Sequence, residues 1–132
     1  MSAQTISTDQ APRAIGPYSQ AISVAIPGRM IFCSGQIPLD PKTGDVVGVG
    51  DIKAQTERVM QNLVAVLNAA GASMQAVAKT TIYLTNLQDF AAVNEIYGHY
   101  FPQDPPARAT VQVSALPRGV QVEIDAVAIV HG

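Results

Sequence analysis

The sequence of 132 residues contains a single cysteine, Cys33. A lone thiol cannot form an intramolecular disulfide, and a domain of this length can bury enough apolar surface to fold without one. The absence of disulfides is typical of a reducing compartment, so we expect a cytoplasmic protein. The polar N-terminus, MSAQTISTDQ, also lacks the basic and then apolar segments that mark a secretory signal.

Long apolar runs and clusters of basic residues are missing as well. No apolar run approaches the roughly 20 residues that cross a bilayer, so we expect a soluble protein with no membrane partner. Eight lysines and arginines are spread along the chain, and the net charge is −2. Nucleic acids bind to clustered positive charge, so we expect no nucleic-acid partner.

Charge of either sign is scarce. Charged residues make up 14% of the chain, whereas about 25% is usual for a globular domain. A small domain has much surface for its volume and should need many charges to cover it. The shortage indicates that another copy of the same chain covers part of the surface. This argument predicts an oligomer without choosing between a dimer and a trimer.

The residue types that usually hold metals or form covalent intermediates are isolated. His99 and His131 have no companion at metal-ligand spacing, so we expect no metal site. Cys33 lies in an apolar segment, where a buried core residue is the expected role. The glycines between residues 44 and 50 lack the pattern of a phosphate-binding loop and are interpreted as loop glycines.

Apolar periodicity and turn residues predict the order strand, strand, helix, strand, helix, strand, strand. An irregular arm is expected over residues 1–16, ending at Gly16-Pro17. The expected strands cover residues 18–25, 29–34, 77–84, 108–114 and 120–130. One helix is expected from the N-cap Asp51 to Gly71, and a second from Asn86 to Phe101-Pro102. This mixture predicts one α+β domain over residues 1–132, with helices packed on one face of a mixed sheet.

Polar residues alternate along the last two predicted strands. Arg108 and Thr110 share one face of the first strand, and Glu123 and Asp125 share one face of the second. If these strands pair as an antiparallel hairpin with their polar faces matched, Thr110 lies near Glu123 and Arg108 near Asp125.

Two interpretations of these polar faces remain open at this point. One is a solvated sheet face with ion pairs between strands, which is the ordinary condition of such sheets. The other is an anion site with a carboxylate that positions water. Arginine suits the second interpretation because its planar fork binds a carboxylate through two parallel hydrogen bonds.

Four blocks of the sequence resemble the signatures of the RidA/YjgF family, in the order in which that family carries them. The blocks are residues 14–21 (AIGPYSQA), residues 34–41 (SGQIPLDP), Asn94 with Tyr97 and 100–102 (YFP), and 106–111 (PARATV) with Leu116-Pro117 and 122–124 (VEI). Together they span nearly the whole chain, which is therefore identified as a member of that family.

The resemblance implies a chorismate-mutase-like α+β fold and a homotrimer with sites in the clefts between subunits. It also implies an enamine/imine deaminase that hydrolyses the reactive 2-imino acids 2-iminobutanoate and 2-iminopropanoate to 2-oxo acids and ammonia. Such an enzyme protects the cell against metabolite damage, and the family's activity implies no cofactor.

The resemblance also assigns residues by position. Arg108 matches the family's carboxylate-binding arginine, and Glu123 matches the acidic residue that helps to place water. Thr110 stands where some members carry cysteine, and its backbone is the group expected to touch the substrate. The residues that match the lining of the cleft are Tyr18, Ser34, Gly35 and Asn94.

Two other functions remain as alternatives. One is a non-catalytic trimeric module that binds small carboxylates and acts as a regulator or a chaperone, and the other is a ribonuclease. The presence of both Arg108 and Glu123 favours catalysis over simple binding. The negative net charge and the lack of a basic stripe argue against an RNA-binding surface.

Overall fold

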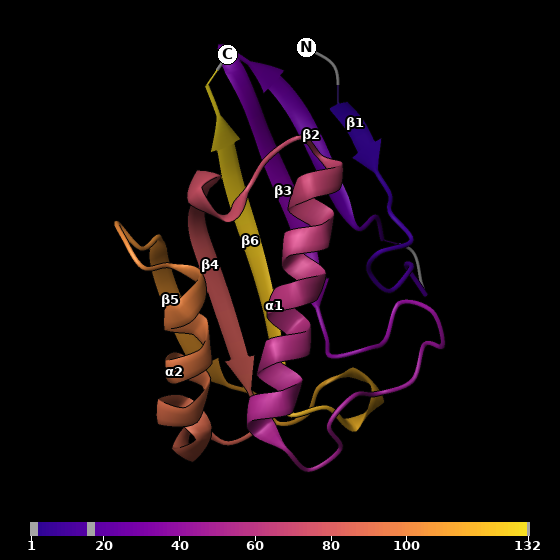
Figure 1. Cartoon of the computed structure of the whole chain (residues 1–132), viewed down its shortest axis with the longest axis vertical. Coiled ribbons are helices and arrows are strands. Elements are labelled where there is room, and N and C mark those ends of the chain that lie inside the picture. Colours follow the sequence, from indigo (N-terminus) through magenta and orange to yellow (C-terminus); the bar gives the residue numbers. More distant parts are fainter. Residues whose placement is uncertain (1–2, 16–17, 132) are drawn as a thin grey trace.

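The computed structural model of the chain describes residues 3–15 and 18–131 (Figure 1). Within these residues, six strands form one mixed sheet in the order β1-β2-β3-β6-β4-β5, and two α-helices lie against one face of it. The strands are β1 (Ala3–Ile6), β2 (Ala21–Ile26), β3 (Gly28–Gln36), β4 (Val77–Leu84), β5 (Ala107–Gln112) and β6 (Val122–Val130). The helices are α1 (Ile52–Ala69) and α2 (Phe90–Tyr100), with short 3-10 turns η1 (Met74–Ala76), η2 (Leu87–Asp89) and η3 (Pro117–Gly119). The predicted α+β class, with helices on one face of a mixed sheet, is confirmed.

Helix α1 begins and ends where its sequence signals indicate. The Asp51 carboxylate accepts a hydrogen bond of 3.1 Å from the backbone N–H of Ala54, which satisfies an N–H group that the helix leaves unpaired. Gly71 follows the helix with a left-handed φ of +78°. The apolar stripe packs on the sheet, and burial of each large aliphatic side chain contributes about 1.5–3 kcal/mol. Its fully buried members are Val59, Met60, Leu63, Val66 and Leu67.

The pairing of the last strands differs from the prediction. Strand β5 pairs with β4 in parallel, and β6 pairs with β3 and with the other edge of β4, so β4 lies between β5 and β6. The predicted hairpin between the last two strands is therefore wrong. The reason is that α2 carries the chain from β4 back to the start of β5, which makes these two strands parallel neighbours.

This order of strands decides which side chains share a face. Thr80 of β4 pairs with Arg108 on one side and with the buried Ala126 on the other, so all three point toward the helices. Tyr83 of β4 pairs with Glu123, and both point to the opposite face. Arg108 and Glu123 therefore lie on opposite faces of the sheet, which corrects the expectation of one shared polar face.

The N-terminal segment also differs from the prediction. Ala3–Ile6 form strand β1, which pairs antiparallel with β2, so the irregular arm is confined to the residues that follow it. The predicted end of the arm, Gly16-Pro17, lies outside the described residues. Strand β2 begins at Ala21, three residues later than the predicted start at Tyr18. None of the described helices is both long enough and apolar enough to span a bilayer.

The sheet face opposite the helices carries exposed apolar side chains. By strand register, Ile22 and Ile26 of β2, Phe32 of β3 and Val111 of β5 all point to this open face. Their exposed fractions range from 38% to 42%. An apolar surface spread over several strands is typical of an interaction site. It therefore agrees with the shortage of charge in the sequence.

Candidate active site

A cavity of about 400 Å³ lies on the open-face side of the molecule, where β3 and β6 meet the segment before β2. It brings together four of the predicted site residues: Tyr18, Ser34, Gly35 and Glu123. Three apolar or aliphatic residues complete its lining, namely Ile15, Ile37 and Pro117. Its volume falls within the range of small-molecule pockets. We call this cavity the Glu123 cleft.

Gly35 allows the backbone of β3 to lie directly against the Glu123 carboxylate. The register between β3 and β6 shifts between Cys33 and Gln36, which marks an irregularity of the strand at this point. A Cβ atom added at Gly35 would overlap Glu123 Oε2 and lie 2.8 Å from Glu123 Cδ. Glycine is thus required here by the close approach of the carboxylate.

Ser34 ties the same stretch of β3 to the segment that carries Tyr18. Its backbone N–H donates a hydrogen bond of 2.8 Å to the carbonyl oxygen of Gln20. Its hydroxyl donates a second hydrogen bond, to the carbonyl oxygen of Ser19. These bonds hold two walls of the Glu123 cleft in place relative to each other.

The surroundings of the Glu123 carboxyl change its pKa. Burial raises the pKa of Glu123, and the negative charge of Asp125, two residues along the same strand face, raises it further. Asp125 is held in place by the hydroxyl of Tyr83, which donates a hydrogen bond of 3.1 Å to Asp125 Oδ2. A carboxylate with a raised pKa is a better proton acceptor, so this environment favours acid–base chemistry.

Arg108 lies on the other face of the sheet, against α2. Its Nη1 donates a hydrogen bond to Asn94 Oδ1. Its Cζ atom lies 5.3 Å from the ring centroid of Phe90 and 5.0 Å from that of Tyr97. Such cation–π contacts contribute roughly 0.5–1 kcal/mol each at exposed positions. Phe90, Asn94 and Tyr97 are spaced so that they share one face of the helix.

The support for Arg108 reaches into the core. The hydroxyls of Tyr97 and Thr80 share a buried hydrogen bond of 2.7 Å, which fixes the ring of Tyr97. Arg108 itself is exposed, and it forms no ion pair with a carboxylate of the described residues. The guanidinium is thus held in position while most of its N–H groups remain available to an anion.

Thr110 lies beside Arg108 on the same face of β5. Its hydroxyl oxygen is buried and has no hydrogen-bond partner among the described residues. Strand β5 is at the edge of the sheet, so one side of its backbone is unpaired within the chain. This exposed edge is where the sequence resemblance expects the backbone of Thr110 to touch a substrate.

The chain therefore separates the predicted site residues into two groups. Tyr18, Ser34, Gly35 and Glu123 line one cleft, whereas Arg108, Asn94 and Thr110 lie across the sheet. One copy of the chain does not place a single small substrate against both Arg108 and Glu123.

Several supporting residues were not singled out for these roles from the sequence. The spacing of Phe90 and Tyr97 from Asn94 indicates that the three share a face of α2, but periodicity does not tell which strand residue packs against that face. Asp125 was placed near Arg108 instead of acting on Glu123. The apolar residues of the cleft, Ile15, Ile37 and Pro117, fall within the family-like blocks but lie in loops without a period, so nothing in the sequence marked them as cleft residues.

Cys33 is buried in the core, as predicted. Burial, with a smaller effect of the Asp125 charge, raises the pKa of the Cys33 thiol to about 12. The thiol therefore stays protonated at neutral pH and is a poor nucleophile. Across residues 3–15 and 18–131, no three histidine, cysteine or acidic side chains gather in a way that could hold a metal ion.

Comparisons with known proteins place these features in context. Residues 8–130 match the protein family described as endoribonuclease L-PSP. Protein DfrA of Myxococcus xanthus is 62% identical over 129 residues, which covers 98% of this chain and 97% of DfrA. The human 2-iminobutanoate/2-iminopropanoate deaminase is 48% identical over 126 residues, covering 96% of this chain and 89% of the human protein. The crystal structure of E. coli TdcF with bound serine superposes with a TM-score of 0.86 at 40% identity, covering 96% of this chain and 98% of TdcF.

The contact between Gly35 and Glu123 can be tested by a double-mutant cycle. Gly35→Ala should lower the free energy of unfolding by about 1–3 kcal/mol, because the added methyl group displaces the carboxylate. In a Glu123→Ala background, Gly35→Ala should lower the free energy of unfolding by a smaller amount, with a difference of at least about 1 kcal/mol. Urea unfolding at equal chain concentration measures both values. Equal costs in the two backgrounds would show that the carboxylate does not abut Gly35.

The influence of Asp125 on Glu123 can be measured by NMR titration of the Glu123 side-chain carboxyl. Asp125→Asn should lower the pKa of Glu123, because the neighbouring negative charge is removed while the amide oxygen can still accept from Tyr83. Asp104→Asn makes the same charge change at an exposed loop position and should leave the pKa of Glu123 unchanged. An unchanged pKa in Asp125→Asn would contradict the assigned cause.

The same shift has a consequence for stability. Since the pKa of Glu123 is higher in the folded than in the unfolded chain, the unfolded chain releases this proton first as the pH rises. Stability from this group is therefore present below the unfolded pKa and is lost as the pH rises through the folded pKa. This decrease in folding stability with rising pH should be smaller in Asp125→Asn than in the unsubstituted chain.

Proposed function

The chain belongs to the endoribonuclease L-PSP family, also known as RidA/YjgF, and from this premise we propose that it is an imine deaminase. The proposed substrates are the reactive 2-imino acids 2-iminobutanoate and 2-iminopropanoate, and the products are 2-oxo acids and ammonia. The observation that carries the proposal is the Arg108 guanidinium, which is held by Asn94 and two aromatic rings and forms no ion pair with an acid of the described residues.

Arg108 is suited to hold the substrate carboxylate. Its planar fork can donate two parallel hydrogen bonds to a carboxylate. Its contacts with Phe90, Asn94 and Tyr97 of α2 fix the direction of the guanidinium. Fixing the carboxylate also orients the imine carbon next to it. E. coli TdcF, which shares this fold, has been crystallised with serine, a ligand that carries such a carboxylate.

A second copy of the chain is needed to complete the site. Arg108 and Glu123 lie on opposite faces of one sheet, so we propose that Arg108 of one copy faces the Glu123 cleft of its neighbour. The exposed apolar side chains of the open face supply a surface that such a copy would bury. We propose a homotrimer with the sites in its inter-subunit clefts, working in the cytoplasm.

The proposed chemistry needs an oriented water and a proton acceptor. The oxygen of the water attacks the carbon of the protonated imine, and Glu123 accepts a proton from that water. The resulting intermediate carries a hydroxyl and an amino group on one carbon. Glu123 then returns its proton to the amino group, and ammonia leaves as the C=O bond forms while the hydroxyl proton passes to the Glu123 carboxylate. The raised pKa of Glu123 makes it able to take up a proton from the water and to return it to the amino nitrogen.

The roles of Arg108 and Glu123 predict different kinetic defects. Arg108→Ala should abolish detectable deamination, because the carboxylate is no longer held. Glu123→Gln should lower kcat by about a hundredfold or more and change KM less, because it removes the proton acceptor and leaves Arg108 to bind the substrate. The measurement follows the decay of an enzymatically generated 2-imino acid, with circular dichroism and sedimentation to verify fold and assembly.

Three outcomes of this experiment would count against the proposal. Full activity of Arg108→Ala would remove its assigned role. A Glu123→Gln variant that binds 2-oxobutanoate more weakly but turns over normally would remove the role in proton transfer. Cleavage of RNA with no acceleration of imine decay would instead support the ribonuclease activity that the family description names.

A further inference from the structure

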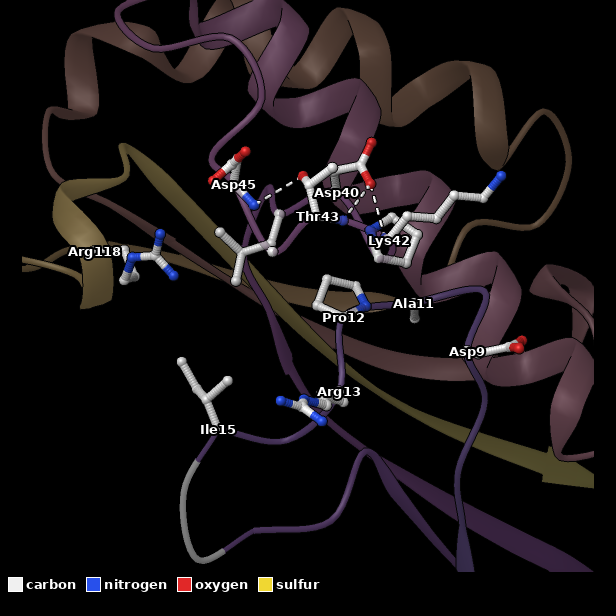
Figure 2. Close-up of a pocket in the computed structure, with 13 residues that line it drawn as sticks. Asp9, Ala11, Pro12, Arg13, Ile15, Asp40, Lys42, Thr43, Asp45 and Arg118 are labelled. Carbon is white, nitrogen blue, oxygen red and sulfur yellow. Dashed lines mark hydrogen bonds between the residues drawn. The ribbon is translucent and has the colours of Figure 1, made fainter.

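A second cavity, of about 650 Å³, lies next to the Glu123 cleft (Figure 2). Its walls are the arm over residues 9–15, the loop over residues 39–45 and Arg118. Ile15 lines both cavities, and Pro117 of the Glu123 cleft is followed directly by Arg118 of the second cavity. The two cavities are therefore neighbours that share a wall. We call the second one the arginine cavity.

The arm is fixed by the buried side chain of Gln20. The Gln20 amide oxygen accepts a hydrogen bond of 2.6 Å from the backbone N–H of Thr8. Its amide nitrogen donates to the carbonyl oxygen of Pro12 at 2.7 Å, and also to those of Thr8 and Ala11. Arg13 therefore extends from a backbone that the core holds in place.

The facing loop is fixed by its own polar groups. The Asp40 carboxylate accepts hydrogen bonds from the backbone N–H groups of Lys42 at 2.8 Å and Thr43 at 3.1 Å. The backbone N–H of Asp45 donates to the Thr43 hydroxyl at 3.1 Å. The first two bonds, both to Asp40 Oδ1, lower the pKa of Asp40.

The charges of the arginine cavity are separated in space. Figure 2 shows the guanidinium groups of Arg13 and Arg118 near Ile15, whereas Asp9 lies toward the opposite end. The carboxylate of Asp45 and the ammonium of Lys42 point away from the arm. Within the described part of the chain, neither Arg13 nor Arg118 forms an ion pair. Arg13 and Arg118 thus place two positive charges at the end of the cavity that borders the Glu123 cleft, and Asp45 lies on the loop beside Arg118 in this view.

The backbone of Arg118 is strained. It has a left-handed φ of 62° within η3 and precedes Gly119, which is also left-handed at 69°. This conformation is unfavourable for a residue with a Cβ atom, and such outliers are concentrated at functional sites. Here it directs a guanidinium group at the cavity.

We infer that Arg13 and Arg118 bind the second carboxylate of a dicarboxylic 2-imino acid. This inference rests on the proposed function and extends its substrate class to imino acids with an acidic tail. The α-carboxylate would bind Arg108 of a neighbouring copy, the imine carbon would face Glu123, and the tail would pass Ile15 to the arginine pair. A guanidinium pair suits a carboxylate because each fork can donate parallel hydrogen bonds.

Binding of stable product analogues tests the site without turnover. The ligands are 2-oxoadipate and 2-oxohexanoate, which have the same chain length and differ by the tail carboxylate. Calorimetry should show that 2-oxoadipate binds at least about tenfold more tightly. Arg118→Ala and Arg13→Ala should each reduce this preference, and together they should abolish it.

Lys42→Ala is the matched control, because Lys42 lines the same cavity but its ammonium points outward. It should retain the full preference for 2-oxoadipate. Equal binding of the two ligands to the unsubstituted protein would overturn the inference. A preference that survives the double arginine substitution, or that Lys42→Ala removes equally well, would also overturn it.

Kinetics with the matching imines separate this inference from the proposed function. For 2-iminoadipate, Arg118→Ala should raise KM several-fold and leave kcat close to its original value. Hydrolysis of 2-iminohexanoate without any preference for the dicarboxylic imine would refute the arginine site alone. Tight binding of 2-oxoadipate without hydrolysis of either imine would refute the deaminase and leave the arginine site standing.

Discussion

The position of β4 between β5 and β6 is the constraint on which the rest of the structure depends. The crossover through α2 makes β5 a parallel neighbour of β4, and β6 occupies the other edge of β4. Arg108 is thereby directed to the helix face and Glu123 to the open face. Because a small substrate cannot reach through a sheet, the two residues can cooperate only when copies of the chain meet.

Both groups of predicted site residues are held in place by contacts within one copy of the chain. On one side, the backbone of Gly35 lies against the Glu123 carboxylate, and Ser34 ties β3 to the segment that carries Tyr18. On the other side, a face of α2 fixes the Arg108 guanidinium, and the core fixes that face through the bond between Tyr97 and Thr80. Side chains held in this way lose little conformational freedom when a substrate binds, which favours precise orientation.

Much of the fold could be predicted from the sequence, because its signals are local. Asp51 and Gly71 mark the ends of α1 through capping chemistry, and the period of two correctly assigns the residues that share a face within a strand. Periodicity does not tell which strand is the neighbour, so the pairing of β5 with β6 was predicted wrongly. The approach of Gly35 to Glu123 depends on a register shift in β3 that leaves no repeating pattern.

The central claim is that one site uses Arg108 of one chain and Glu123 of another, and mixed assemblies test it most directly. Arg108→Ala and Glu123→Gln chains, each with at most a small residual activity alone, are unfolded together in equal amounts and refolded. Random assembly should restore about a quarter of the sites, because each intact site needs one unsubstituted half from each of two chains. Co-purification through a tag on one variant verifies that the chains mix. A mixed assembly no more active than its parents would contradict the account.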